Sequence, residues 1–223
     1  MQALLQAQIT TQQEILATLT EEALAAGATQ EQLNEIDQEA AAAADDHAQD
    51  GQAQARAGAG TGVSVLPILR WPDPRLSRVC DPVSGDAAGL AADMLDTMYA
   101  AKGRGLAAPQ VGHMLRLFVM DVTWKTGAKA PRVFVNPELE VSYTRFESGE
   151  EACLSIPGVA ARVNRPPEVV IRWSDLDGVR HEEHMTGFAA RCVQHEVDHL
   201  NGLVIFDRLP PDHRAQMEKD YAR

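Results

Sequence analysis

The stretch Gln194-His195-Glu196-Val197-Asp198-His199 carries the strongest pattern in the chain, two histidines four residues apart with a glutamate beside the first. It lies in a segment from Gly187 to about Asn201 whose composition predicts a helix. Residues four apart share one face of a helix, so both imidazoles can reach the same metal ion. The stretch therefore predicts a metal-binding helix, and the apolar residues around it indicate that the helix is buried on its histidine side.

A catalytic metal needs a third protein ligand besides two histidines. Cys192 is close in sequence, but an ion midway between the histidines would lie ~7–8 Å from it along the helix axis. A cysteine side chain with a metal–sulfur bond of ~2.3 Å does not span that distance, so Cys192 is interpreted as a small lining residue. Cys153 follows a run of polar and charged residues in an extended segment, which Pro157-Gly158 is expected to close. A cysteine thiolate at this position would be a stable metal ligand. Cys80 is expected to pack in the core.

A second unusual string is Gly103-Arg104-Gly105-Leu106-Ala107-Ala108-Pro109-Gln110-Val111-Gly112. It is only faintly similar to a dinucleotide-binding fingerprint, because no strand is expected before it and Pro109 interrupts the helix that should follow. Small residues here instead allow the backbone to pass close to a ligand. Gln110 then offers an amide donor at the end of that passage.

The remaining pattern of the compact part favours an α+β fold, because strands and helices follow one another without regular alternation. Asp177-Gly178 is a strong hairpin turn signal between two of the expected strands. The other elements are expected as helices at Asp86–Lys102 and Pro211–Arg223 and as strands at Leu115–Val122, Arg132–Val135, Val169–Trp173 and Val179–Met185.

Residues 1–62 differ from the rest in composition. They contain no aromatic residue and no proline, and they carry −9 of the net charge of −12. We interpret residues 1–62 as an acidic, helical or disordered extension with a linker, and residues 63–223 as the catalytic domain. No segment reaches the ~18 apolar residues needed to cross a bilayer, so no membrane association is expected. The absence of a basic excess disfavours direct nucleic-acid binding.

Together the three strings resemble those of peptide deformylases. That family carries, in this order, a G-x-G-x-A-A-x-Q string, an E-G-C-x-S string and a Q-H-E-x-D-H string. They correspond here to residues 103–110, 151–155 and 194–199. The resemblance extends from about Val63 to the C-terminus. It implies antiparallel or mixed sheets around a buried metal-binding helix, and an enzyme that removes the formyl group from the N-terminal formyl-methionine of new polypeptides and releases formate.

The resemblance also implies the cofactor and the roles of the central residues. Cys153, His195 and His199 would bind one divalent ion, with ferrous iron as the physiological metal and zinc, nickel or cobalt also acceptable to this ligand set. Glu196 would act as general base and then pass its proton to the leaving amine. Gln110 and the backbone N–H of Leu154 would stabilise the charge that develops on the formyl oxygen.

The expected substrate pocket is less regular. Phe188 and Cys192 precede His195 by seven and three residues and are the candidates for the wall of a methionine slot, with Gly105 beside it. Arg104 stands where an apolar residue is common, and Ala152 stands where the second string usually has glycine. Such an alanine is strained if the position needs a positive φ, and otherwise narrows the cleft. Ala160 replaces a common arginine, whose contact Arg162 would take over.

Two charged residues of the helix are expected to lie off the metal. Asp198 points away if both histidines face the ion, and we expect it to pair with an arginine, with Arg165 as the candidate. Arg191 is interpreted as facing solvent or forming an ion pair.

Two other functions stay open at this point. An H-E-x-x-H metallopeptidase would need a third histidine or acidic ligand downstream of His199, and no downstream residue has a matching context. A deformylase-like protein with little turnover, which binds formylated N-termini or another partner, is favoured only by Ala152 and Arg104. The expected location is the cytoplasm, with weak or transient ribosome contact and room for a protein partner or self-association through residues 1–62.

Overall fold

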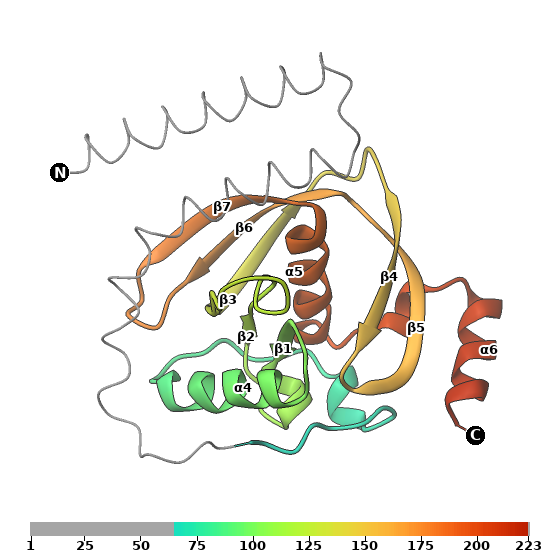
Figure 1. The fold of residues 1–223 in the computed structure, drawn as a ribbon, viewed down its shortest axis with the longest axis horizontal. Helices are drawn as coiled ribbons and strands as arrows, with labels where there is room; N and C mark the ends of the chain where they lie inside the picture. Colours follow the sequence, from blue (N-terminus) through green and yellow to red (C-terminus); the bar gives the residue numbers. More distant parts are fainter. Residues whose placement is uncertain (1–64, 223) are drawn as a thin grey trace. The chain divides into compact units, whose positions relative to one another are not determined.

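The computed structural model describes residues 65–222, and Figure 1 shows how their helices and strands are arranged. The expectations for residues 1–62 lie outside the described residues. The expected α+β class with antiparallel sheets is confirmed. No helix within residues 65–222 is long and apolar enough to cross a membrane.

The larger sheet has five antiparallel strands in the order β1-β2-β3-β6-β7. Two strands are expected, one on either side of the Asp177-Gly178 turn. These strands form an antiparallel hairpin in which Val170 lies opposite His184. Strands β6 and β7 differ by one residue from their expected bounds at each end. The strand bounds are Gly105–Ala107 (β1), Leu117–Met120 (β2), Arg132–Val141 (β3), Glu168–Ser174 (β6) and Arg180–Thr186 (β7).

Strand β3 is longer than the sequence indicates. The pattern predicts an end at Val135 because Asn136-Pro137 follows, and a proline removes a ladder donor. The chain instead continues through a bulge between Val135 and Glu138, with Asn136 at a φ of 50°. The Asn136 side chain bonds the backbone of Val83 through both its oxygen and its nitrogen, which fixes this conformation.

Helix α5 (Gly187–Leu200) contains the two histidines and packs across the sheet, as Figure 1 shows. Its apolar residues Val193, Val197 and Leu200 join the aromatic side chains Phe118 and Phe134 of the sheet in one buried cluster. Burial of such side chains is the main driving force for this layer. The predicted helix is confirmed, and its polar face is left to meet the second sheet.

The second sheet is the hairpin of β4 (Glu147–Cys153) and β5 (Ile156–Arg165). The expectation that Pro157-Gly158 closes the extended segment is wrong. Cys153 pairs with Ile156, so Leu154 and Ser155 form the turn, and Pro157-Gly158 lies within β5. This hairpin packs through Ile156 and Val163 against Phe206. The two short helices after α5 are η5 (Ile205–Arg208) and α6 (Pro211–Tyr221).

Helix α4 (Ala88–Ala100), the first α-helix within residues 65–222, lies within the predicted range. Its buried residues Met94 and Met98 pack against Leu106 of β1. Strand β1 is not predicted by the sequence, because three residues are too few to show an alternating pattern. It leads into the single turn η4 (Ala108–Val111), which contains Pro109. This connection carries the glycine-rich string past α5.

Candidate metal centre

Three candidate ligands come together where α5 faces the hairpin. The ligand atoms of Cys153, His195 and His199 all lie within 4.8 Å of one another. Cys153 ends β4, whereas the histidines are one turn apart on α5. The Sγ atom of Cys153 is 3.2 Å from Nε2 of His199. Nδ1 of His199 is buried without a hydrogen-bond partner in the described part of the chain. One soft thiolate and two imidazoles fit a divalent transition metal.

The three cysteines differ in their electrostatic surroundings. Burial alone would raise the pKa of the Cys153 thiol, but His199 and His195 hold it well below its ordinary value. Burial and the nearby Glu196 raise the pKa of Cys192, and burial raises the pKa of Cys80 to about 11. A thiolate is the form that binds metals. Cys153 is therefore the thiol suited to bind an ion, and Cys192 does not join the ligand group.

Glu151 orients one histidine. Its Oε2 accepts a hydrogen bond from Nδ1 of His195 at 3.0 Å, which leaves Nε2 of that ring for an ion. Burial alone would raise the pKa of Glu151, but Arg165 and His195 lower it well below its usual range. A carboxylate behind a ligating histidine fixes the tautomer and the ring orientation. Glu151 and Cys153 are two apart in β4, so both side chains point to the same face.

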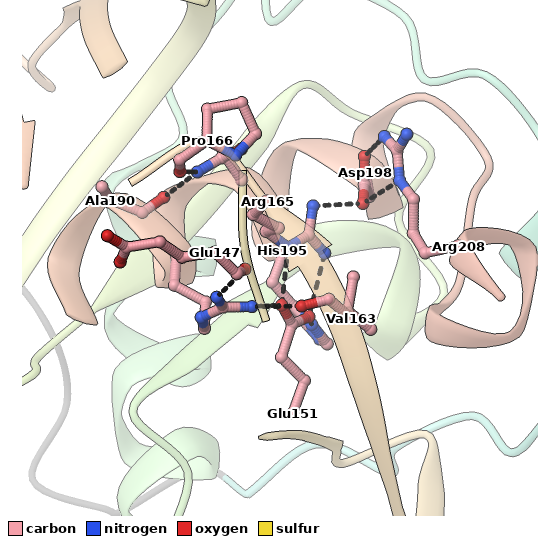
Figure 2. A network of polar contacts seen from close by, with 11 residues as sticks. Glu147, Glu151, Val163, Arg165, Pro166, Ala190, His195, Asp198 and Arg208 are labelled. Carbon is pink, nitrogen blue, oxygen red and sulfur yellow. Dashed lines mark hydrogen bonds and ion pairs between the residues drawn. The ribbon is translucent and has the colours of Figure 1, made fainter. Parts of the chain in front are cut away.

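Two further charged residues complete a buried network around Glu151 (Figure 2). Arg165 donates from Nε to Oε1 of Glu151 at 2.6 Å and from Nη1 to Oδ2 of Asp198 at 2.9 Å. The expected pairing of Asp198 with Arg165 is therefore found, and Arg208 also pairs with Asp198. Because Asp198 lies on α5 and Glu151 on β4, Arg165 joins the helix to the hairpin that carries Cys153.

Arg191 forms an ion pair, one of the two expected alternatives. Its Nη1 donates to Oε1 of Glu151 and to the Val163 carbonyl, both at 2.9 Å, and its Nη2 donates to the Glu147 carbonyl. The guanidinium crosses β4 at Gly149, where an added Cβ would lie 2.6 Å from Cζ of Arg191. A side chain at position 149 would therefore displace the Arg191 guanidinium from this crossing.

The Gln110 amide is held in one orientation. Its Oε1 accepts from the Ala107 N–H at 2.8 Å, so Nε2 faces the other way, toward Ser155 Oγ at 3.2 Å and Cys153 Sγ at 3.6 Å. The Gln110 amide N–H, which is predicted to stabilise the formyl oxygen, thus lies beside the candidate metal ligand Cys153. Leu154, the second assigned donor, follows Cys153 in the turn, and its carbonyl accepts from Arg70.

Glu196 is buried beside the candidate ligands, with 4% of its surface exposed. Its Oε2 has no hydrogen-bond partner in the described residues. Burial raises the pKa of Glu196 to about 7. A carboxyl group with this pKa can both take and give a proton near neutral pH.

Gly105 lies directly against this carboxylate. A Cβ added at Gly105 would be 2.2 Å from Oε1 of Glu196 and 2.7 Å from its Cδ. Gly105, which the sequence predicts to give a ligand room, thus also leaves room for the Glu196 carboxylate. A side chain at this position would displace that carboxylate.

We expect Gly105→Ala to lower kcat/KM by ~10²-fold, because displacing a reacting group by ~1 Å has an effect of this size. The metal content should be unchanged, since no ligand is touched. Gly89→Ala is the matched control. It lies on α4 with open space around its Cα, and it should keep full activity with a slightly higher melting temperature. Normal activity in Gly105→Ala would show that Glu196 tolerates displacement.

The expected pocket residues are brought together in part. The guanidinium carbon of Arg104 lies 5.0 Å from the centre of the Phe188 ring, and the Arg104 carbonyl faces Cys192 Sγ at 3.9 Å. Cys192 is buried, whereas 51% of Phe188 is exposed. Phe188 lies in the first turn of α5, where its ring reaches solvent. An exposed ring nevertheless suits the wall of an open slot.

Ala152 is not strained by a positive φ. The non-glycine residues with positive φ in the described range are Lys102 and Asn136. Ala152 is exposed and lies opposite Ala160, beside a bulge between Ala152 and Cys153. Of the two alternatives, backbone strain is therefore contradicted, and a narrowed cleft stays a prediction. Arg162 lies opposite Glu150 in the same register.

The sequence does not reveal the roles of Glu151 and Arg191 by itself. A signal for Glu151 exists, because an i, i+2 spacing from Cys153 places both on one face of a strand. This spacing indicates a shared face only if residues 147–153 are already recognised as a strand. Arg191 gives no such signal, since its carbonyl acceptors are far away in sequence.

The chain is similar to known proteins of one family. Residues 65–215 match the model of the polypeptide deformylase family. A peptide deformylase of Afipia carboxidovorans is 44% identical over 164 residues, which cover 72% of this chain and 96% of that protein. One from Psychrobacter cryohalolentis is 43% identical over 150 residues, covering 66% and 80%. The crystal structure of a Legionella pneumophila peptide deformylase is similar with a TM-score of 0.66 at 39% identity, covering 71% of this chain and 94% of the other.

Proposed function

The chain belongs to the polypeptide deformylase family, and we propose that Cys153, His195 and His199 bind the single metal ion of this enzyme. It is a hydrolase that removes the formyl group from newly made polypeptides. The observation that carries the ligand assignment is the approach of these three side chains to within 4.8 Å, with Cys192 outside the group.

We propose ferrous iron as the ion used in the cell, with zinc, nickel and cobalt as acceptable replacements, because a thiolate and two imidazoles suit all of them. When bound, such an ion supplies Lewis acidity and lowers the pKa of a water molecule toward ~7. Glu151 supports this role by fixing the ring of His195 from behind, and Arg165 fixes Glu151.

Glu196 is proposed as the proton carrier. Its carboxylate takes the proton from the attacking water and later donates it to the nitrogen that leaves, so that the formyl carbon ends in formate and the methionine amine is freed. Its burial beside Gly105 keeps the carboxyl group at one place for both transfers.

Gln110 and Leu154 are proposed to stabilise the negative charge on the formyl oxygen. The amide Nε2 of Gln110 already faces the Cys153 side of the site and is held there by the Ala107 N–H. The Leu154 N–H belongs to the turn that follows Cys153. Loss of one such donor typically costs ~2.7–4 kcal/mol in the transition state.

We propose that the first side chain of the substrate lies along α5 beside Cys192 and Phe188, with Arg104, Gly105 and Ala152 bordering the passage. The proposal rests on the position of Cys192 and Phe188 on the histidine side of the helix and on the exposed ring of Phe188.

The direct test is release of formate from the peptide formyl-Met-Ala-Ser, together with metal analysis of the purified protein. We expect one metal per chain and formate release that stops after removal of the metal by a chelator and returns after addition of ferrous iron. Binding of Met-Ala-Ser without formate release from the iron-loaded protein would favour a deformylase-like binder with little turnover. A metallopeptidase is not favoured, since no residue after His199 joins the ligand group in the described part of the chain.

The place of action is proposed to be the cytoplasm, where new chains begin and where reducing conditions suit the three free cysteines. Weak ribosome contact without direct nucleic-acid binding, and a partner or second copy bound through residues 1–62, are further proposals that follow from the composition of that segment.

A further inference from the structure

Three cations gather beside the site without being part of the catalytic group. Lys102 and Arg104 flank Gly103, and Lys125 belongs to the loop that packs on the same glycine, because Nε1 of Trp124 donates to the Gly103 carbonyl at 2.7 Å. The Asp121 N–H donates to the Arg104 carbonyl at 2.9 Å and so ties the start of this loop to β1. Partial desolvation and the charges of Arg104 and Lys102 lower the pKa of the mostly exposed Lys125, as expected for cations held close together.

This group, the cationic rim of Lys102, Arg104 and Lys125, has no ion-pair partner within residues 65–222. The contrast with the buried network is clear, since Arg165 and Arg191 both pair with Glu151. Nε of Arg104 is buried and has no acceptor among the described residues. An unpaired guanidinium in this setting lacks the carboxylate that it would bind most strongly.

The rim lies within reach of a bound substrate. Arg104 precedes Gly105, which touches Glu196, and its guanidinium lies over Phe188. Phe188 is two turns before His195, or ~10 Å along the helix axis. An extended peptide advances ~3.3 Å per residue, so its first three residues cover this distance from the metal ligands.

We propose that the cationic rim makes this enzyme prefer formylated chains that carry a carboxylate side chain within their first three residues. The inference rests on the proposed site and names its substrate preference. Arg104 supplies the hydrogen bonds, and Lys102 and Lys125 supply additional positive potential.

The acidic residues of the hairpin form no ion pair with the cationic rim within residues 65–222. Glu147 pairs with Arg145, and Glu147 and Glu150 line a hollow that Phe188 and Arg191 also border. Glu196 and Glu151 are buried, and Glu151 is matched by two arginines. Among the described residues Arg104, over the ring of Phe188, is therefore an unpaired cation at the edge of this hollow, in a chain whose overall charge is −12.

The test compares four peptides that differ near the N-terminus: formyl-Met-Ala-Ser, formyl-Met-Glu-Ser, formyl-Met-Ala-Glu and formyl-Met-Lys-Ser. At low ionic strength we expect the better of the two glutamate peptides to exceed the lysine peptide by at least ~tenfold in kcat/KM, which equals ~1.4 kcal/mol. The ratio should fall as salt is added, because salt screens charges at the surface.

Arg104→Gln should reduce the ratio to near one, and Lys125→Gln, at an exposed position, should reduce it in part. Lys219→Gln removes the same unit of charge from α6 and should leave the ratio unchanged. Equal rates for all four peptides, or a ratio that Arg104→Gln and Lys125→Gln both leave intact, would overturn the proposal while the deformylase activity stands.

A binding measurement separates this proposal from the proposed function. Calorimetric titration of the metal-loaded protein with the products Met-Glu-Ser, Met-Ala-Glu and Met-Lys-Ser needs no turnover. Tighter binding of at least one glutamate product, lost in Arg104→Gln, supports the rim even if no formate is released. Equal binding of all three products contradicts it.

Discussion

Glu196→Gln is expected to keep its metal and to lose ~10²–10⁴-fold or more in kcat/KM. This range is the usual contribution of one positioned proton carrier. The effect should lie toward its upper end, since the same carboxyl group serves both the attack of water and the departure of the amine. Glutamine has nearly the same size and fits the space beside Gly105, so the loss reports on proton transfer rather than on packing.

The measurement is formate release with metal content determined on the same sample. Glu168→Gln is the control, because it neutralises an exposed carboxylate on β6 away from the candidate ligands. Its activity should match that of the unmodified enzyme. Near-normal formate release from metal-loaded Glu196→Gln would remove Glu196 from the mechanism, whatever its burial.

Cys153→Ser is expected to have the second large effect, in this case on the metal itself. A serine hydroxyl stays protonated where the Cys153 thiol is held as a thiolate by His199 and His195, which lower its pKa. Loss of an outer partner of a ligand typically costs ~10–100-fold in metal affinity, so loss of the ligand should exceed ~100-fold. Activity should fall with the metal content.

Cys192→Ser is the matched control, with the same chemical change at a thiol whose pKa is raised by burial. It lies one turn before His195 and faces the Arg104 carbonyl, so it should retain the metal even if the substrate pocket changes. Retained metal in Cys153→Ser together with loss in Cys192→Ser would reverse the ligand assignment.

The sequence by itself determined the features that depend on short spacings. The two histidines of α5 share a face because a helix repeats every ~3.6 residues, and the rise of the same helix predicts that Cys192 lies too far away to be their third ligand. The hairpin of β6 and β7 followed from its alternating pattern and its Asp-Gly turn. The α+β class followed from the order of these elements, and the three ordered strings were sufficient to identify the family.

Only the tertiary structure decided which distant residues touch. The β4–β5 hairpin escaped prediction because the polar residues of β4 show no apolar–polar alternation, and with it the role of Glu151 behind His195. The contact of Gly105 with Glu196 and the position of Arg104 over Phe188 also depend on how β1 passes α5. Such contacts arise from packing between elements, and packing is set by the whole buried surface rather than by any local period. The sequence therefore pointed to the chemistry, whereas the fold decided how each reacting group is supported and what surrounds the substrate.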